Sequence, residues 1–170
     1  MKTYLLLFTI LGCLSLSSCH EDEEPEADPC ADSSWARVDK QGVSTCYGTA
    51  GLTYSRPNTS NATINARFYQ GVVIGEAEFI EANFAIPASG VELNMAYPLI
   101  DGTYYDSEEL VSGEITFISF EYSPTGDDSQ CVTGTFSLTS RNANSGNTTT
   151  FTDGKFIVTG PTNTPTCNPF

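Results

Sequence analysis

The chain has 170 residues, of which 39% are hydrophobic, and carries a formal net charge of −14 from 21 acidic and 7 basic residues. This length suits one domain with a real core. The acidity argues against binding to nucleic acid or to an anionic membrane surface, because both repel a protein of the same sign.

The first residues have the pattern of an export signal that ends at a cysteine. Lys2 precedes an apolar run, Leu5–Leu16, which is too short to span a bilayer permanently. The pattern predicts a lipoprotein signal peptide over 1–18. The Leu-Ser-Ser-Cys sequence at its end resembles the lipobox of bacterial lipoproteins, which implies that Cys19 receives lipid and becomes the new first residue. A single acyl chain anchors weakly, so we expect several chains to hold the protein to the membrane.

An acidic segment follows the lipidation site. Residues 20–29 contain six acids and two prolines. Such a stretch cannot bury enough surface to offset its conformational entropy, so residues 19–34 are predicted to be the lipidated cysteine and a solvated tether. An acidic run in this place also resembles the signal that sends lipoproteins of Bacteroidota-type bacteria to the outer face of the outer membrane. The resemblance implies a surface-exposed protein.

From residue 35 to residue 170 the hydrophobic pattern has a period of two. Alternation of this kind runs through Ile64–Phe68, Val91–Tyr97 and Val132–Leu138, and it is typical of strands with one buried and one solvated face. Turn residues separate the runs, and no stretch of a dozen residues keeps a helical stripe. The pattern predicts an all-β domain, a single antiparallel β-sandwich (alternatively a small β-barrel) of about seven to nine strands.

Two segments break the alternation. Within Ile115–Tyr122 the apolar parity changes midway, which predicts a β-bulge or a strand covered on both faces. Within Phe151–Phe156 the Asp-Gly pair is compatible with a tight hairpin or with a bulge at Gly154. We favour the bulge, because it leaves one long strand to pair with Cys131–Ser140.

The six cysteines fall into three groups. Cys13 lies in the signal, Cys19 is the lipidation site, and four remain in the exported part: Cys30, Cys46, Cys131 and Cys167. An even number in an exported domain favours two disulfides, and the wide spacings argue against zinc. Three pairings are possible. We favour Cys30–Cys46 and Cys131–Cys167, because a hairpin turning near Asn144 places Cys131 opposite the strand end near Val158.

Few residues suggest catalysis or a cofactor. His20, the only histidine, lies in the tether, which argues against a Ser-His or Cys-His nucleophile, and there is no Gly-rich phosphate loop. We expect no cofactor and no metal. The weak calcium candidates are the turn residues Asp101, Asp106, Asp127 and Asp128, whose spacing does not resemble an EF-hand. The carboxylates that a glycosidase would need are available as Glu76, Glu78, Glu114 and Glu121, but we favour the simpler explanation that they form the solvated face of an acidic sheet.

Aromatic residues provide weak ligand-binding candidates. Trp35, Tyr104 and Tyr105 offer flat rings on which sugars stack. If Tyr104 and Tyr105 lie on one strand, one of the two rings must point outward.

Four short motifs resemble a known family. They are Asp101–Tyr105, Ser112–Thr116, Val132–Leu138 and Thr152–Val158. In this order they are similar to the G-T-Y, S-G-x-I-T, V-x-G-T-F-S-F and T-x-G-x-F-x-V motifs of a family of small Bacteroidota lipoproteins. The resemblance covers roughly residues 62–158, with Leu138 in place of a phenylalanine. It implies an exported all-β domain of unknown function and transfers no catalytic residue.

These observations favour a non-enzymatic, lipid-anchored envelope protein that binds a glycan or a partner envelope protein. The alternative is a small carbohydrate-active enzyme that uses paired carboxylates.

Overall fold

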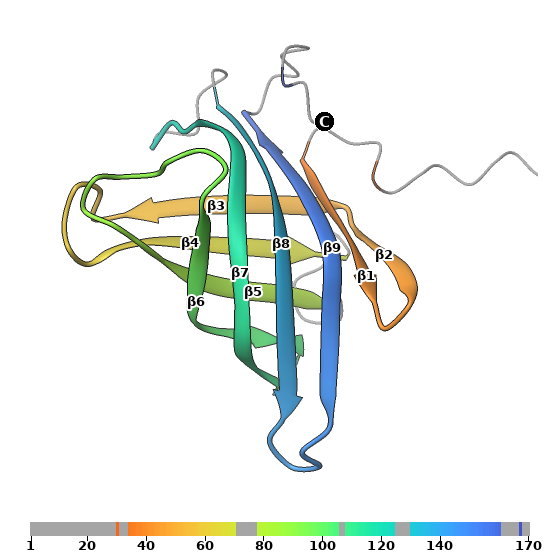
Figure 1. Cartoon of the computed structure of the whole chain (residues 1–170). Coiled ribbons are helices and arrows are strands. Elements are labelled where there is room, and N and C mark those ends of the chain that lie inside the picture. The colour runs from red at the N-terminus through yellow and green to blue at the C-terminus, as the bar shows by residue number, and fades with distance from the viewer. Residues whose placement is uncertain are drawn as a thin grey trace, which may run out of the picture.

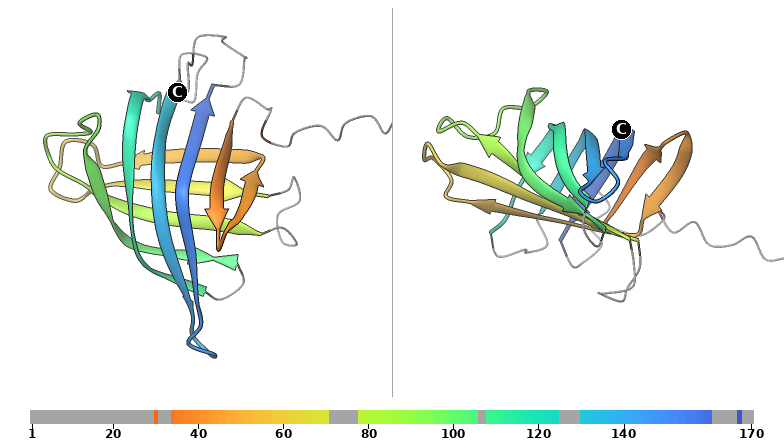
Figure 2. Two further views of the ribbon diagram at one scale, coloured as in Figure 1. Left: turned by 45° about the vertical axis from the view of Figure 1, so that its right-hand side comes forward. Right: turned by 90° about the horizontal axis from the view of Figure 1, so that it is seen from below.

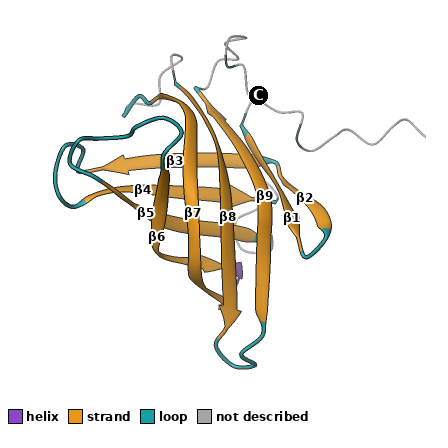
Figure 3. Cartoon of the chain, in the orientation of Figure 1, coloured by secondary structure: helices purple, strands orange, loops and turns teal. Residues whose placement is uncertain are grey.

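The computed structural model describes Cys30, residues 34–70, 78–105, 108–124 and 130–160, and Cys167. These residues form nine strands and no α-helix; the one helical position in the described residues is a 3₁₀ turn at Tyr105, purple in Figure 3. The strands are β1 (Trp35–Lys40), β2 (Val43–Tyr47), β3 (Thr49–Ser55), β4 (Ala62–Tyr69), β5 (Phe79–Ile86), β6 (Ala96–Tyr104), β7 (Glu108–Glu121), β8 (Cys131–Asn142) and β9 (Thr148–Thr159).

All nine strands belong to one antiparallel sheet with the order β2-β1-β9-β8-β7-β6-β5-β4-β3. The sheet coils strongly, so that β3, β4 and β5 pass across the back of β7, β8 and β9 (Figures 1 and 2). The two edge strands, β2 and β3, are consecutive in the chain and are joined by Gly48 alone. The all-β prediction is therefore confirmed: one sheet, nearly closed into a barrel-like shape, forms two layers around a common core.

The core fills the space between these two layers. On β4 and β5, every second residue points inward, as the burial of Ile64, Phe68, Ile80 and Phe84 shows. From the other layer Phe136 stacks on Phe68, with ring centroids 4.8 Å apart. The aromatic rings thus connect strands that are distant along the chain but face each other across the core.

Two glycines let large rings enter this core. Gly134 of β8 lies directly opposite Phe156 of β9, and Phe136 of β8 lies opposite Gly154 of β9. A Cβ atom on Gly134 would come within 2.8 Å of the Phe156 ring, and one on Gly154 within 2.8 Å of the Phe136 ring. Each glycine therefore provides the space that the opposite ring occupies.

Both predicted bulges are present. The β7–β8 register shifts between Phe117 and Ser119, which explains the change of apolar parity in β7. The β8–β9 register shifts between Phe136 and Leu138, and β9 continues through the Asp-Gly pair as one strand of 12 residues. Asp153 takes a positive φ of 52° at this bulge.

The strand expected over Val91–Tyr97 is wrong in its first half. β6 begins only at Ala96, and Leu93 and Met95 are exposed. The alternation is misleading here because a turn precedes the strand: Asn94 has a positive φ, and its N–H bonds to the carbonyl oxygen of Phe117.

Two disulfides attach the ends of the described chain to the sheet. Cys30 is bonded to Cys46 of β2, and Cys131 of β8 is bonded to Cys167, which are the favoured pairings. Cys30 is buried, so this part of the predicted tether, 19–34, is attached to the domain. The signal peptide and the lipidation site Cys19 lie outside the described residues.

Candidate functional site

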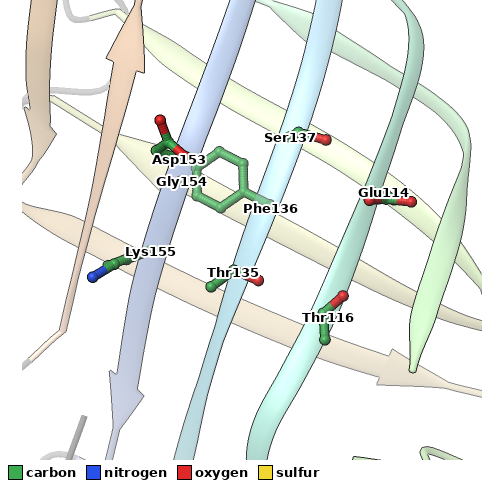
Figure 4. A pocket seen from close by; sticks show the side chains of 8 residues that line it. All are labelled: Glu114, Thr116, Thr135, Phe136, Ser137, Asp153, Gly154 and Lys155. Atoms are coloured by element: carbon green, nitrogen blue, oxygen red, sulfur yellow. The ribbon is translucent and has the colours of Figure 1, made fainter. Parts of the chain in front are cut away.

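A polar groove lies on the outer face of β7, β8 and β9 (Figure 4). Its volume is about 290 Å³, close to the lower limit for small-ligand sites. The lining residues are Glu114, Thr116, Thr135, Phe136, Ser137, Asp153, Gly154 and Lys155.

Strand alternation places the polar lining on the outside. On β8, Phe136 points into the core, so its neighbours Thr135 and Ser137 point outward. The same alternation on β7 buries Ile115 and turns Glu114 and Thr116 outward. The inner residues of these strands fill the core while the outer ones are free to form a hydrogen-bonding surface.

Register arranges these groups in two rows across the strands. In one row Thr116, Thr135 and Lys155 lie directly opposite one another on β7, β8 and β9. In the other row Glu114 lies opposite Ser137, and Ser137 lies at the register shift that contains Asp153. Each row offers three polar side chains from three neighbouring strands.

The bulge in β9 brings Asp153 into the second row. An extra residue between Phe151 and Gly154 rotates the strand locally, and Asp153 is exposed at this point. Without the extra residue, the β9 pattern would place either Phe151 or Phe156 on the wrong face. The groove therefore depends on the same irregularity that keeps both rings in the core.

The chemistry of the groove is that of hydrogen bonding to a polar ligand. It combines three hydroxyl groups, two carboxylates and one ammonium group, which together accept and donate hydrogen bonds in several directions. No cluster of three or more histidine, cysteine, aspartate or glutamate side chains suited to a metal occurs in the described residues.

Trp35 lies on the same outer face, on β1. It is opposite Ile157 of β9, and the next outward position of β1, Arg37, is opposite Lys155. Trp35 is half-buried, so part of its indole is accessible to solvent. The ring therefore extends the polar face with an aromatic surface on which a sugar can stack.

Tyr104 and Tyr105 do not join Trp35 in a binding platform. Tyr104 is buried, with its ring edge-to-face against Phe151 at 4.9 Å. Tyr105 is 43% exposed, so one ring of the pair points outward, as expected. Lys40 lies over the Tyr104 ring, at the opposite end of β1 from Trp35. The candidate role of Tyr104 as an exposed stacking surface is thus wrong, because its strand parity turns it into the core.

A partly buried polar cluster, formed by Lys40, Tyr47 and Glu78, is a second notable feature. The Lys40 Nζ atom lies 2.6 Å from Oε2 of Glu78, and the Tyr47 hydroxyl donates a hydrogen bond of 2.5 Å to Oε1 of the same carboxylate. Tyr47 is completely buried. The cluster connects the β1–β2 hairpin, at one edge of the coiled sheet, to the residue that precedes β5.

Hydrogen bonding dominates the electrostatics of this cluster. Partial burial raises the pKa of Glu78, but the hydrogen bonds from Lys40 and Tyr47 outweigh it and the net pKa is lowered. Partial burial likewise lowers the pKa of Lys40, but its bonds to Glu78 and Tyr104 outweigh it and the net pKa is raised. Both groups therefore stay charged over a wide pH range, which suits a structural ion pair.

The remaining candidates are spread over the molecule. Asp101 accepts a hydrogen bond of 2.6 Å from Asn83 on the outer face of β5 and β6. Of the candidate carboxylates, Glu114 lines the groove, Glu78 belongs to the partly buried cluster with Lys40 and Tyr47, and Glu121 ends β7. Asp106, Asp127, Asp128 and Glu76 lie outside the described residues.

Comparison with protein-family models, with curated proteins and with solved structures found no match. In the described part of the chain there is no helix with the length and apolar character needed to cross a membrane. The described strands form one all-β sheet with a groove on its outer face, and the function proposed below is inferred from that groove.

Proposed function

We propose that the protein is a lipid-anchored envelope protein of the bacterial outer membrane, exposed at the cell surface, which binds a glycan without transforming it. The observation that carries the glycan part is the groove: six polar side chains in two rows on three neighbouring strands. The anchoring part rests on the export signal and on Cys19.

The polar composition of the groove favours a hydroxyl-rich ligand. Sugars present alternating donors and acceptors, which match hydroxyl and carboxylate side chains. The strands beneath the groove are fixed by ladder hydrogen bonds on both sides and by the packed core, so the site is largely preformed and little ordering entropy is lost on binding. Trp35 adds an aromatic surface on the same face.

A thermal-stability screen of the purified, oxidised protein against glycans tests this proposal. A ligand at about a hundred times its dissociation constant adds roughly 2.7 kcal/mol to the free energy of unfolding. We expect Thr135→Val to weaken binding about two- to tenfold, because one neutral hydrogen bond contributes about 0.5–1.5 kcal/mol. Thr63→Val on the outer side of β4 is the matched control. A panel without any glycan hit, together with an envelope protein crosslinked at the groove, would instead establish a protein partner.

The anchor is tested separately in cells. Cys19→Ser should release the protein from the membrane fraction, while Cys13→Ser should leave it there. Digestion by a protease added to intact cells would establish surface exposure. Retention of the Cys19→Ser variant in the membrane would contradict anchoring by lipid.

One observation favours a second candidate, a carbohydrate-active enzyme. Glu114 and Asp153 line the same groove on either side of Ser137, and two carboxylates are the minimum that glycoside hydrolysis requires. Any glycan that binds should therefore be incubated with the protein and analysed for shortened products. Turnover that disappears in both Glu114→Gln and Asp153→Asn would establish the enzyme and replace the binding-only proposal.

A further inference from the structure

The two polar rows are the sides of a channel that crosses the strands. Thr116, Thr135 and Lys155 follow one another by register on one side, and Glu114, Ser137 and Asp153 follow one another on the other. In Figure 4 the Lys155 side chain leaves β9 on the side away from Thr135. Along each strand the two sides are two residues apart, or about 6.6 Å. The residues between them, such as Ile115 and Phe136, point into the core, so the backbone and the edge of Phe136 form the channel floor.

The channel continues onto β6. Ala96 lies directly opposite Thr116, and Pro98 lies directly opposite Glu114, both exposed on the outer face. These side chains are short, and so they extend both sides of the channel without closing it. From β6 to β9 the channel covers three strand spacings, about 14 Å.

We infer that the site binds an internal stretch of a linear, electrically neutral polysaccharide, with the sugar chain laid across the strands from β6 to β9. This inference rests on the proposed glycan-binding function and specifies its ligand. A channel bordered on both sides and not closed at β6 fits a chain better than a single sugar. On β7, β8 and β9 each strand contributes one pair of polar side chains, so successive sugar units meet hydrogen-bonding partners along these three strands.

Charge argues for a neutral chain. The channel carries two carboxylates and one ammonium group, and the whole chain has 21 acidic residues against 7 basic ones. An acidic polysaccharide with one charge per unit would be repelled by the excess negative charge of these groups. Neutral hydroxyl groups avoid this repulsion and still donate hydrogen bonds to the two carboxylates.

A peptide fits the channel less well. An extended peptide binds a sheet by pairing with an edge strand, where backbone donors and acceptors are available. The channel instead lies over β7, β8 and β9, each of which is hydrogen-bonded to a neighbouring strand on both sides. Its floor offers no backbone ladder.

Isothermal titration of the purified protein with oligosaccharide series tests the inference. The probes are cello-, xylo-, malto- and laminari-oligosaccharides, each from the disaccharide to the hexasaccharide, with oligogalacturonates as the acidic series. In at least one neutral series the hexasaccharide should bind about tenfold tighter than the disaccharide. Oligogalacturonates should bind more weakly than neutral chains of the same length.

A blocking variant locates the chain. Ala96→Trp places a large ring at the β6 end of the channel and should weaken hexasaccharide binding about tenfold while sparing the disaccharide. Ser44→Trp, at an exposed position of the edge strand β2, is the matched control and should change neither affinity.

The outcomes separate the inference from the proposed function. A disaccharide that binds as tightly as the hexasaccharide, or an acidic series that binds best, would overturn the inference and leave glycan binding established. Equal loss with Ala96→Trp and Ser44→Trp would also overturn it, since the channel would then not be the site. Absence of binding by every glycan would overturn the proposed function and the inference with it.

Discussion

Replacing Gly134 by alanine is the sharpest test of how this fold is packed. The added methyl group would lie against the carbonyl oxygen of Thr116 and within 2.8 Å of two atoms of the Phe156 ring. Phe156 is completely buried, so its ring cannot swing into solvent, and the backbone of β7 is fixed by its ladder. The strain must therefore appear as a shift of packed atoms.

The expected cost follows from that contact. Overpacking of a well-ordered core costs about 1–3 kcal/mol, and contact with backbone as well as with a ring places Gly134→Ala at the upper end. Gly51→Ala is the matched control, because a Cβ there meets nothing within 4 Å. The control should be neutral or more stable by about 0.4–1 kcal/mol, since alanine restricts the unfolded chain.

Urea unfolding of the oxidised protein measures the difference. With a slope of about 2 kcal/mol/M, the two variants should differ in midpoint by about 1 M or more. Equal midpoints would refute the claim that Gly134 is required by the ring opposite it. A changed slope would instead indicate an altered unfolded state.

Three further predictions concern the partly buried ion pair of Lys40 and Glu78 and the two disulfides. Because the pKa of Glu78 is lowered in the folded protein, its contribution to stability is complete above its ordinary pKa of 4.5 and is lost as the pH falls through the folded pKa. Glu78→Gln should therefore lower the free energy of unfolding by about 1–3 kcal/mol at neutral pH and flatten the acid limb of a plot of that free energy against pH. An unchanged acid limb would contradict this role. Because the folded pKa of Lys40 is raised, its stabilisation is complete below its ordinary value of 10.5 and is lost as the pH rises through the folded value, so Lys40→Met should remove that alkaline dependence in the same measurement. Replacing Cys131 and Cys167 by serine should lower the free energy of unfolding by about 4 kcal/mol, and replacing Cys30 and Cys46 by about 3 kcal/mol, because these disulfides close loops of 36 and 16 residues, respectively. If the Cys30–Cys46 variant unfolds at the lower temperature instead, the loop-entropy argument fails here.

The sequence predicts the strands and their irregularities well wherever side-chain parity is decisive. The parity change in Ile115–Tyr122 and the competition between hairpin and bulge at Gly154 both have only a few sterically reasonable solutions, and the structure contains the expected bulges. The segment Val91–Met95 misleads because its alternation is accidental: nothing in a single strand pattern shows that Asn94 will turn and bond to Phe117.

The groove was not predictable in the same way. Glu114 was a candidate, but Asp153, Lys155 and Ser137 were not, because their proximity depends on the register of three strands and on one extra residue in β9. The sequence does indicate that Thr135 and Ser137 point outward, because they occupy the polar positions of an alternating strand. That signal is shared by every solvated strand, so only the register distinguishes this face from others.

The motifs that resemble those of the lipoprotein family also acquire a physical meaning. The glycine and phenylalanine of Val132–Leu138 pair with the phenylalanine and glycine of Thr152–Val158: Gly134 lies opposite Phe156, and Phe136 lies opposite Gly154. Such a reciprocal arrangement serves packing. The inward-facing glycines and phenylalanines of these motifs therefore serve packing, while outward-facing residues of the same motifs, among them Thr135 and Ser137, line the groove.

One residue couples the two faces. Gly154 supports the Phe136 ring on the inside and lines the groove beside Asp153 on the outside. Gly154→Ala should therefore lower both stability and glycan affinity, because a Cβ 2.5 Å from the Phe136 carbonyl oxygen must displace the β8 backbone that carries Thr135 and Ser137.

Gly102→Ala provides the comparison that isolates this coupling. A Cβ on Gly102 would meet Leu110 at 2.7 Å, a clash of similar severity, but Gly102 lies in β6 outside the groove lining. Both variants should unfold at lower urea concentration, and only Gly154→Ala should bind a glycan ligand more weakly when the comparison is made well below both midpoints. Equal affinities for the two variants would mean that β8 absorbs the strain without moving its outer side chains, and the bulge would then be a packing device alone.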